Sequence, residues 1–249
     1  MYKIIIKISI ILIVLNLSLF GSSLITKVDY EGGISLFGKV AEANITLEQD
    51  PEINTYNMKI VASSTGIVKA LTSNRKDTFI SEGNIIDGVY RPKKFTEITT
   101  KNGYFEKTLY TFEYKKDRVL KETFLEEIVT ENSYDIINLK KISKQKLVKL
   151  NDKKYIKLQP NDYISMFLNL SVGKLNIGEL RYIDQKESDK VLLLTKNIFE
   201  VIKHNGAEKY RIIFYKKNEL FFDKAVAEDI AFYGDAYLKK IVIDSTFMN

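Results

Sequence analysis

Hydrophobic and polar residues alternate along the chain from about residue 24 onward. This is the pattern of β-strands that bury one face and leave the other in water. In residues 41–48, alanine, isoleucine and leucine alternate with glutamate, asparagine and threonine, and residues 56–63 repeat the alternation. A polar stretch over residues 50–54 separates the two runs. The pattern predicts two antiparallel strands joined by a turn.

Similar runs follow towards the C-terminus, separated by short polar stretches. Asn102-Gly103 is the type of dipeptide most typical of a tight hairpin turn. In residues 210–215, the consecutive residues Ile212, Ile213 and Phe214 are all apolar, so both faces of a strand there would be apolar. We therefore expect a central strand that is covered on both faces. The further strands are expected at residues 78–81, 95–100, 108–114, 119–129, 191–195, 199–203, 210–215, 220–223 and 237–243.

Two segments, residues 64–74 and 161–170, have helical periodicity instead, and Asn161 or Asp162 can cap the second. The predicted fold class is therefore mainly β: an antiparallel sheet curled as an open barrel or a sandwich, with two short helices. We interpret residues 24–249 as one domain. Within it, the lysine-rich residues 132–159 lack a regular period and are expected to be an irregular junction, a loop or an irregular strand.

The N-terminal segment, residues 1–23, has the pattern of a secretory signal peptide. Lys3 and Lys7 precede an apolar run, and the small residues Gly21-Ser22-Ser23 follow it. We expect cleavage near Ser23 and a periplasmic location, with membrane contact only through this segment. The alternative is an uncleaved single-pass anchor.

The amino-acid composition excludes several classes of functional site. The chain has 249 residues and no cysteine, which excludes disulfides, zinc–thiolate sites, iron–sulfur clusters and thiol nucleophiles. Its net charge is +6, of which Lys3 and Lys7 supply two, and acids and bases are interspersed. A mildly basic, mixed surface of this kind does not indicate a nucleic-acid groove, so we expect no nucleic-acid partner.

An ordered set of short motifs resembles domain-of-unknown-function family 3108, exported proteins of Gram-negative bacteria. The motifs are Val28-Asp29-Tyr30 with Gly38, Ser63-Ser64-Thr65-Gly66, Ser81-Glu82-Gly83, Gly88-Val89-Tyr90-Arg91-Pro92 with Phe95, and Asn161-Asp162-Tyr163-Ile164-Ser165-Met166-Phe167 with Gly173. The resemblance covers most of residues 25–245 and implies an envelope location and a β-rich fold. It implies no reaction. By analogy alone, such folds are similar to open half-barrel carriers that shield lipid-like ligands.

Catalytic and metal sites lack their usual residues. His204 is the only histidine, and its polar neighbours indicate an exposed turn at a strand end. With one histidine and no cysteine, a zinc site is not expected. Glu126 and Glu127 are adjacent, so a strand would point them to opposite faces. The chain also lacks nucleophile-elbow, P-loop and dinucleotide-binding motifs. We therefore expect no enzyme activity, no cofactor and no metal.

Four residues are candidates for ligand binding. Tyr110, Phe112 and Tyr114 share one strand face, which either lines an apolar cavity or belongs to the core. Arg91 contacts a ligand or partner, or is a turn arginine held extended by the proline after it. Asn44 lies on the wet face of its strand in an N-x-T sequence with an acid two residues upstream, which makes it a candidate glycosylation site.

The leading functional hypothesis is an exported, non-catalytic protein that binds a lipid-like or glycan ligand of the envelope. The alternative is a structural or scaffolding protein that binds an envelope protein. A hydrolase built from scattered carboxylates is a third hypothesis. The sequence sets neither the ligand nor the oligomeric state.

Overall fold

The computed structural model describes residues 23–135, 140–205, 208–217, 220–227 and 235–248. Its strands are β1 (Ser23–Ile34), β2 (Gly38–Asp50), β3 (Thr55–Ser64), β4 (Lys76–Ile86), β5 (Val89–Lys101), β6 (Tyr104–Glu113), β7 (Arg118–Asp135), β8 (Lys140–Lys157), β9 (Gly178–Leu180), β10 (Lys190–Thr195), β11 (Ile198–Asn205), β12 (Glu208–Tyr215), β13 (Lys224–Ala227) and β14 (Ala236–Met248). The described helices are α2 (Gly66–Leu71) and α3 (Tyr163–Ser171), and η1 (Tyr114–Lys116) is a single 3₁₀ turn.

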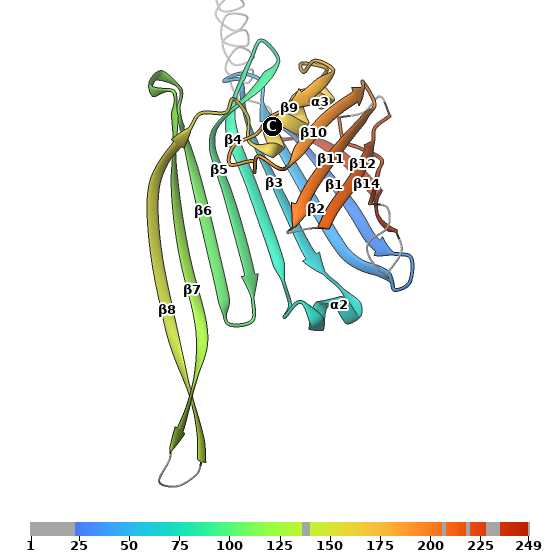
Figure 1. Cartoon of the computed structure of the whole chain (residues 1–249). Coiled ribbons are helices and arrows are strands. Elements are labelled where there is room, and N and C mark those ends of the chain that lie inside the picture. The colour runs from blue at the N-terminus through green and yellow to red at the C-terminus, as the bar shows by residue number, and fades with distance from the viewer. Residues whose placement is uncertain (1–22, 136–139, 206–207, 218–219, 228–234, 249) are drawn as a thin grey trace, which may run out of the picture.

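The 14 described strands form one sheet in the order β8-β7-β6-β5-β4-β3-β2-β1-β14-β13-β12-β11-β10-β9. Each strand runs antiparallel to its neighbours. The first eight strands form one meander and the last six another, and the pairing of β1 with β14 joins them. In Figure 1, β10–β12 lie in front of β1–β3, so the sheet turns back on itself. β8 and β9 end the described sheet unjoined, which confirms an antiparallel fold curled as an open barrel.

Helix α3 links the two meanders, because it follows β8 and precedes β9. Ile164 and Leu168 on α3 are almost fully buried and pack with residues from both meanders, such as Met58 and Phe221. The predicted helix over residues 64–74 is present as the shorter α2, of which no residue is buried. No helix in the described ranges has the length and apolarity needed to cross a membrane.

Residues 220–223, expected to be a strand, are not one, and β13 begins at Lys224. Phe221 and Phe222 are both buried, at 0% and 8% exposed, although they are adjacent. A strand sends adjacent side chains to opposite faces, so it could not place both rings in one core. The segment crosses the core instead, where the Tyr30 hydroxyl donates a hydrogen bond to the carbonyl oxygen of Phe222 at 2.7 Å.

The expected irregular junction over residues 132–159 is also corrected. Most of it is β8, which pairs in continuous register with β7 from Arg118↔Lys157 to Asp135↔Lys140. Apolar and polar residues do not alternate here because residues 143–155 of β8 are exposed on both faces. The predicted signal peptide, residues 1–23, lies outside the described residues apart from Ser23, the first residue of β1.

Candidate functional site

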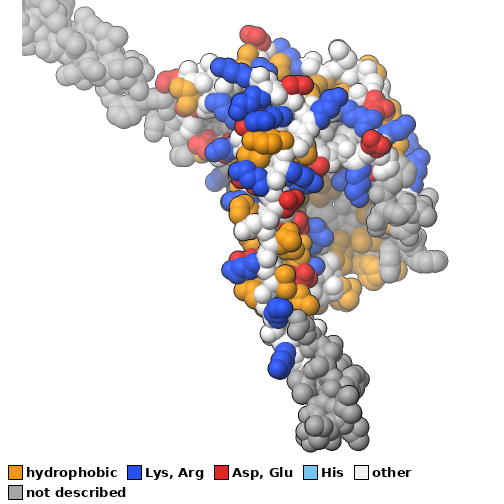
Figure 2. All heavy atoms as spheres, turned by 60° about the vertical axis from the view of Figure 1, so that its left-hand side comes forward, with side chains coloured by type: hydrophobic (Ala, Val, Ile, Leu, Met, Phe, Trp, Pro, Cys, Tyr) orange, Lys and Arg blue, Asp and Glu red, His pale blue; other side chains and the backbone are white. Residues whose placement is uncertain are grey.

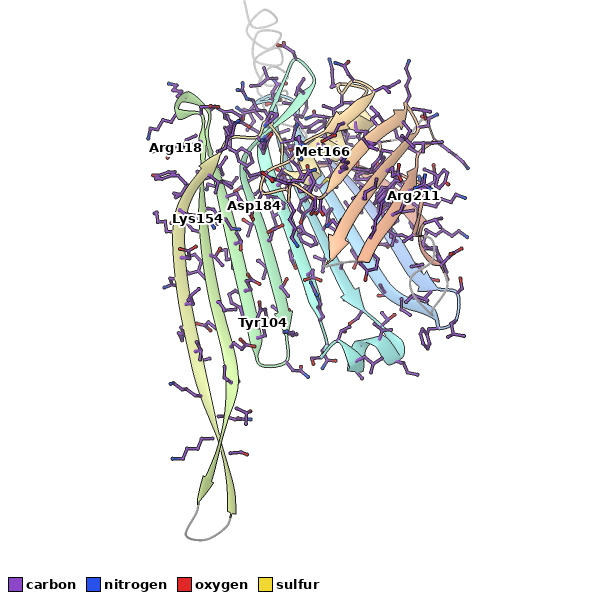
Figure 3. The ribbon with its side chains drawn as sticks, in the orientation of Figure 1. Tyr104, Arg118, Lys154, Met166, Asp184 and Arg211 are labelled. Atoms are coloured by element: carbon purple, nitrogen blue, oxygen red, sulfur yellow. The ribbon has the colours of Figure 1, made fainter. Side chains whose placement is uncertain are left out.

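A cavity of about 560 Å³, mostly apolar and partly open, lies where the sheet turns back on itself. One wall is the inner face of β2–β6, the second is β10–β12, and α3 and the segment after it complete the enclosure. Figure 3 shows Met166 and Asp184, which both line the cavity, in the crowded upper part of the molecule, well above Tyr104. The apolar lining includes Ile45, Met58, Ile60, Phe79, Ile164, Met166, Phe167, Val191, Phe199, Val201, Ile212, Phe214 and Phe222.

The wall formed by β11 and β12 is aromatic. The register places Phe199 opposite Phe214, and their rings stack at 4.4 Å between centroids. Phe222 meets Phe214 edge-on at 5.2 Å, and Phe167 of α3 meets Phe222 edge-on at 5.3 Å. Interlocked rings of this kind resist rearrangement, so this wall is a preformed apolar surface.

Asp162 fixes the start of α3. Its Oδ1 accepts hydrogen bonds from the backbone N–H groups of Ile164 and Ser165, both at 2.8 Å, which is the N-cap arrangement predicted for this residue. Its Oδ2 accepts from the Ser81 hydroxyl at 2.7 Å, and the Tyr56 hydroxyl lies 3.0 Å from Ser81. Burial raises the pKa of Asp162 to about 6, although these hydrogen bonds oppose the shift. Asp162 therefore caps the N-terminus of α3 and also connects the helix to β4 and, through Ser81, to β3.

Asn169 fixes the other end of α3 against β5. Its Oδ1 accepts a hydrogen bond from the Tyr90 backbone N–H at 2.7 Å, and its Nδ2 donates to the Tyr90 carbonyl oxygen at 2.9 Å. Nδ2 also donates to Oδ1 of Asn161 at 2.9 Å. The amide thus pairs with the backbone of one residue as a neighbouring strand would. With both ends held, α3 keeps a fixed position over the cavity.

One end of the cavity is polar. Glu97 on β5 lines it, and its Oε2 accepts a hydrogen bond from the Tyr110 hydroxyl at 3.3 Å. The Tyr163 hydroxyl also donates to Glu97. Tyr110 lies 3.1 Å from Oδ2 of Asp184 as well, and the Lys121 ammonium is 2.5 Å from the same oxygen. Two carboxylates and one ammonium therefore surround the Tyr110 hydroxyl.

Burial sets the protonation preferences at this end. It raises the pKa of Glu97, against the Tyr163 and Tyr110 hydrogen bonds and the charge of Lys121. Burial, together with the nearby Glu97 charge, also raises the pKa values of Tyr110 and Tyr163. Both phenols therefore remain protonated and act as hydrogen-bond donors near neutral pH.

The four predicted ligand-binding residues separate in the structure. Tyr110 lines the cavity, whereas Phe112 is a core residue, 8% exposed, with its ring stacked on Tyr114 at 5.9 Å. Arg91 and Tyr114 line a different depression beside the C-terminal half of α3. There the Arg91 guanidinium lies over the Tyr114 ring, 4.0 Å from its centroid. The shared strand face was predicted, but only Tyr110 reaches the main cavity.

The other singled-out residues lie away from the cavity. Asn44 is exposed on β2, and its amide donates to Oδ1 of Asp29 at 2.7 Å. Glu126 forms an ion pair with Lys149 at 2.6 Å, while Glu127 is on the opposite face of β7. His204 pairs with Lys209 in the β11–β12 register, and its side chain lies outside what the structure describes. In the described ranges, no group of three or more histidine or acidic side chains could hold a metal ion.

Sequence reasoning missed Glu97, Tyr163, Tyr182 and Asp184 as members of the site. Glu97 carried a usable signal, because it follows Phe95 by two residues in an alternating strand and therefore shares its inner face. An acid on an apolar face is unusual enough to indicate a function. Asp184 gave no such signal, since its segment has no regular structure between Arg181 and Asp189.

No family model and no curated protein matches the chain. Among solved structures, it is similar to a crystal structure described as a beta-barrel-like protein of domain of unknown function DUF1849 from Brucella abortus. That likeness has 11% sequence identity and a TM-score of 0.38, and it covers 89% of this chain and 97% of the other.

Proposed function

We propose that this protein is an exported, non-catalytic binding protein whose cavity holds a lipid-like ligand. The observation that carries the proposal is the 560 Å³ cavity between the two walls of the open barrel, with its mostly apolar lining. A cavity of this size is within the usual range for small-molecule sites. The periplasmic location in this proposal rests on the export signal predicted for residues 1–23.

The lining favours a lipid-like ligand over a glycan. A glycan carries hydroxyl groups on nearly every carbon, and each needs a hydrogen-bond partner once it is removed from water. The rings of Phe199 and Phe214 offer none, and the hydrogen-bonded groups of Glu97, Tyr110 and Asp184 lie together at one end. An acyl or other apolar chain, by contrast, gains free energy from every methylene it buries there.

Binding of N-phenyl-1-naphthylamine, a neutral probe that fluoresces in apolar surroundings, tests this proposal. We expect saturable binding at one site per chain. Ile60→Trp, which places a large ring in the cavity, should weaken binding at least tenfold. Lys59→Trp is the matched control, because it adds the same ring to the exposed opposite face of β3 and should leave affinity unchanged. Absent binding, or equal loss in both variants, would count against a cavity ligand.

A second candidate function rests on β8, an 18-residue edge strand of the described sheet. Figure 2 shows the side of the molecule formed by β7 and β8, where basic and hydrophobic side chains are interspersed. Leu147 and Leu150 of β8 are about half exposed. β8 already matches its lysines to acids of β7, as in the 2.8 Å ion pair of Lys153 with Glu122. An acidic extended segment of an envelope protein would fit its free edge in the same way. Photo-cross-linking from position 150 should then capture such a protein, and position 58, on the inner face, should not.

A further inference from the structure

We propose that the polar end of the cavity recognises a cationic headgroup, so that the ligand is an amphiphile with an ammonium group beside Glu97. This inference rests on the proposed function and specifies its ligand. It starts from the position of Glu97, which lines an otherwise apolar cavity and lies opposite Phe79 in the register of β4 and β5.

Of the two carboxylates at this end of the cavity, Asp184 forms an ion pair and Glu97 does not. Asp184 has its counter-ion, because the Lys121 ammonium is 2.5 Å from its Oδ2. Glu97 has hydroxyl partners instead, from Tyr110 and Tyr163, and forms no ion pair with another described residue. A carboxylate held partly out of water without a counter-ion favours a cation more strongly than an exposed one does. The ligand's ammonium would supply that missing charge.

Aromatic rings complete the site. Tyr110, Tyr163 and Tyr182 all line the cavity together with Glu97. The rings of Tyr163 and Tyr182 meet edge-on at 5.8 Å, and Phe95 packs on both Tyr110 and Tyr163. Tyrosine rings gathered around a carboxylate are the surroundings in which ammonium and quaternary ammonium groups bind well, through ring quadrupoles and direct charge attraction.

An anionic headgroup fits this end less well. It would lie near Glu97 and Asp184, while the nearest ammonium, that of Lys121, is already bound to Asp184. Lys186 and Lys203 also line the cavity, but both are exposed, so water and salt screen them. The position of the unmatched charge therefore favours a cation over a fatty acid.

Three amphiphiles with the same chain length test the inference: dodecyltrimethylammonium, dodecanol and dodecanoate. Each is used below its own critical micelle concentration to displace N-phenyl-1-naphthylamine from the purified protein. We expect dodecyltrimethylammonium to bind at least tenfold more tightly than dodecanoate. Glu97→Gln should reduce that preference to threefold or less and change the affinity for dodecanol less than threefold. Glu106→Gln is the control, since it removes a carboxylate from the same inner face outside the cavity and should keep the preference.

Two results would overturn the headgroup assignment alone: dodecanoate binding as tightly as the cation in the unmodified protein, or Glu97→Gln retaining the full preference while the probe still binds. The comparison in the unmodified protein decides the matter even where the variant does not fold. Failure of the probe and of all three amphiphiles to bind would overturn the proposed function and this inference with it.

Discussion

At the scale of single residues, the buried carboxyl of Asp162 holds the start of α3 against the sheet. It is 0% exposed and joins a helix N-terminus to Ser81 and Tyr56 on the sheet. A raised pKa means that the folded protein favours the protonated carboxyl over the ionised one. The negative charge that Asp162 carries at neutral pH therefore destabilises the fold. The geometry of the cap and the cost of its charge therefore oppose each other.

Stability should consequently fall as the pH rises through the titration of Asp162. Its pKa is about 6 in the folded protein and near 3.8 when unfolded, so the folded state binds the proton more tightly in that window. At 1.36 kcal/mol per pKa unit, the unfolding free energy should lose about 3 kcal/mol from this group between pH 3 and pH 7.

Asp162→Asn keeps a cap acceptor and should remove that contribution. Urea unfolding at several pH values measures the difference between the two proteins. Asp152→Asn, the loss of an exposed acid on β8, is the control. An identical pH dependence of stability in the Asp162→Asn variant and the unmodified protein would contradict the prediction.

At the scale of elements, β7 shows how one strand changes its role along its length. Val119, near its start, is 0% exposed and packs in the core, whereas Val129, ten residues later on the same face, is 38% exposed. Figure 1 shows β7 and β8 extending beyond the ends of the other strands. The far part of this hairpin is held by strand pairing, while the near part is held by the core.

The substitution of threonine for valine should therefore have unequal effects at the two positions. Val119→Thr buries a hydroxyl group among apolar side chains and should cost about 1–3 kcal/mol of unfolding free energy. Val129→Thr should stay within about 0.5 kcal/mol, because its hydroxyl can reach water. Urea unfolding of both variants measures this, and equal losses would show that the far hairpin also has a packed face.

At the scale of the whole molecule, the cavity is shared by the two meanders. Ile60 and Phe79 belong to the first, and Phe199 and Phe214 belong to the second. Ile183 on the connecting segment is anchored through its N–H to the carbonyl oxygen of Asn161 at 2.8 Å. A ligand between the walls would contact both meanders at once and bind only the folded chain.

Ligand binding should therefore raise the melting temperature. At a free probe concentration of one hundred times Kd, linkage gives about 2.7 kcal/mol, which for a chain of this size is a rise of roughly 5–10 °C. Thermal unfolding followed by circular dichroism, with and without N-phenyl-1-naphthylamine, measures it. Ile60→Trp should lose most of the rise and Lys59→Trp should retain it. A melting temperature that stays constant while the probe is bound would mean that the probe sits outside the folded cavity.

Local patterns in the sequence determined most of the strands, the Asn102-Gly103 turn, both described helices and the Asp162 cap. They could do so because alternation reports which face of a strand is buried, and a cap is satisfied within three residues. They failed where burial does not alternate, as in Phe221-Phe222, and where neither face is buried, as in β8.

Only the tertiary structure decided which distant segments meet. The packing of α3 and the segment after it against the inner face of β5 and β6 brings Glu97 of β5, Tyr163 of α3 and Asp184 together. Of the predicted ligand-binding residues, Tyr110 alone is among them. The reason is physical: periodicity records how each face is solvated, whereas the register and closure of a sheet depend on the packing of the whole core, which no short window of sequence contains.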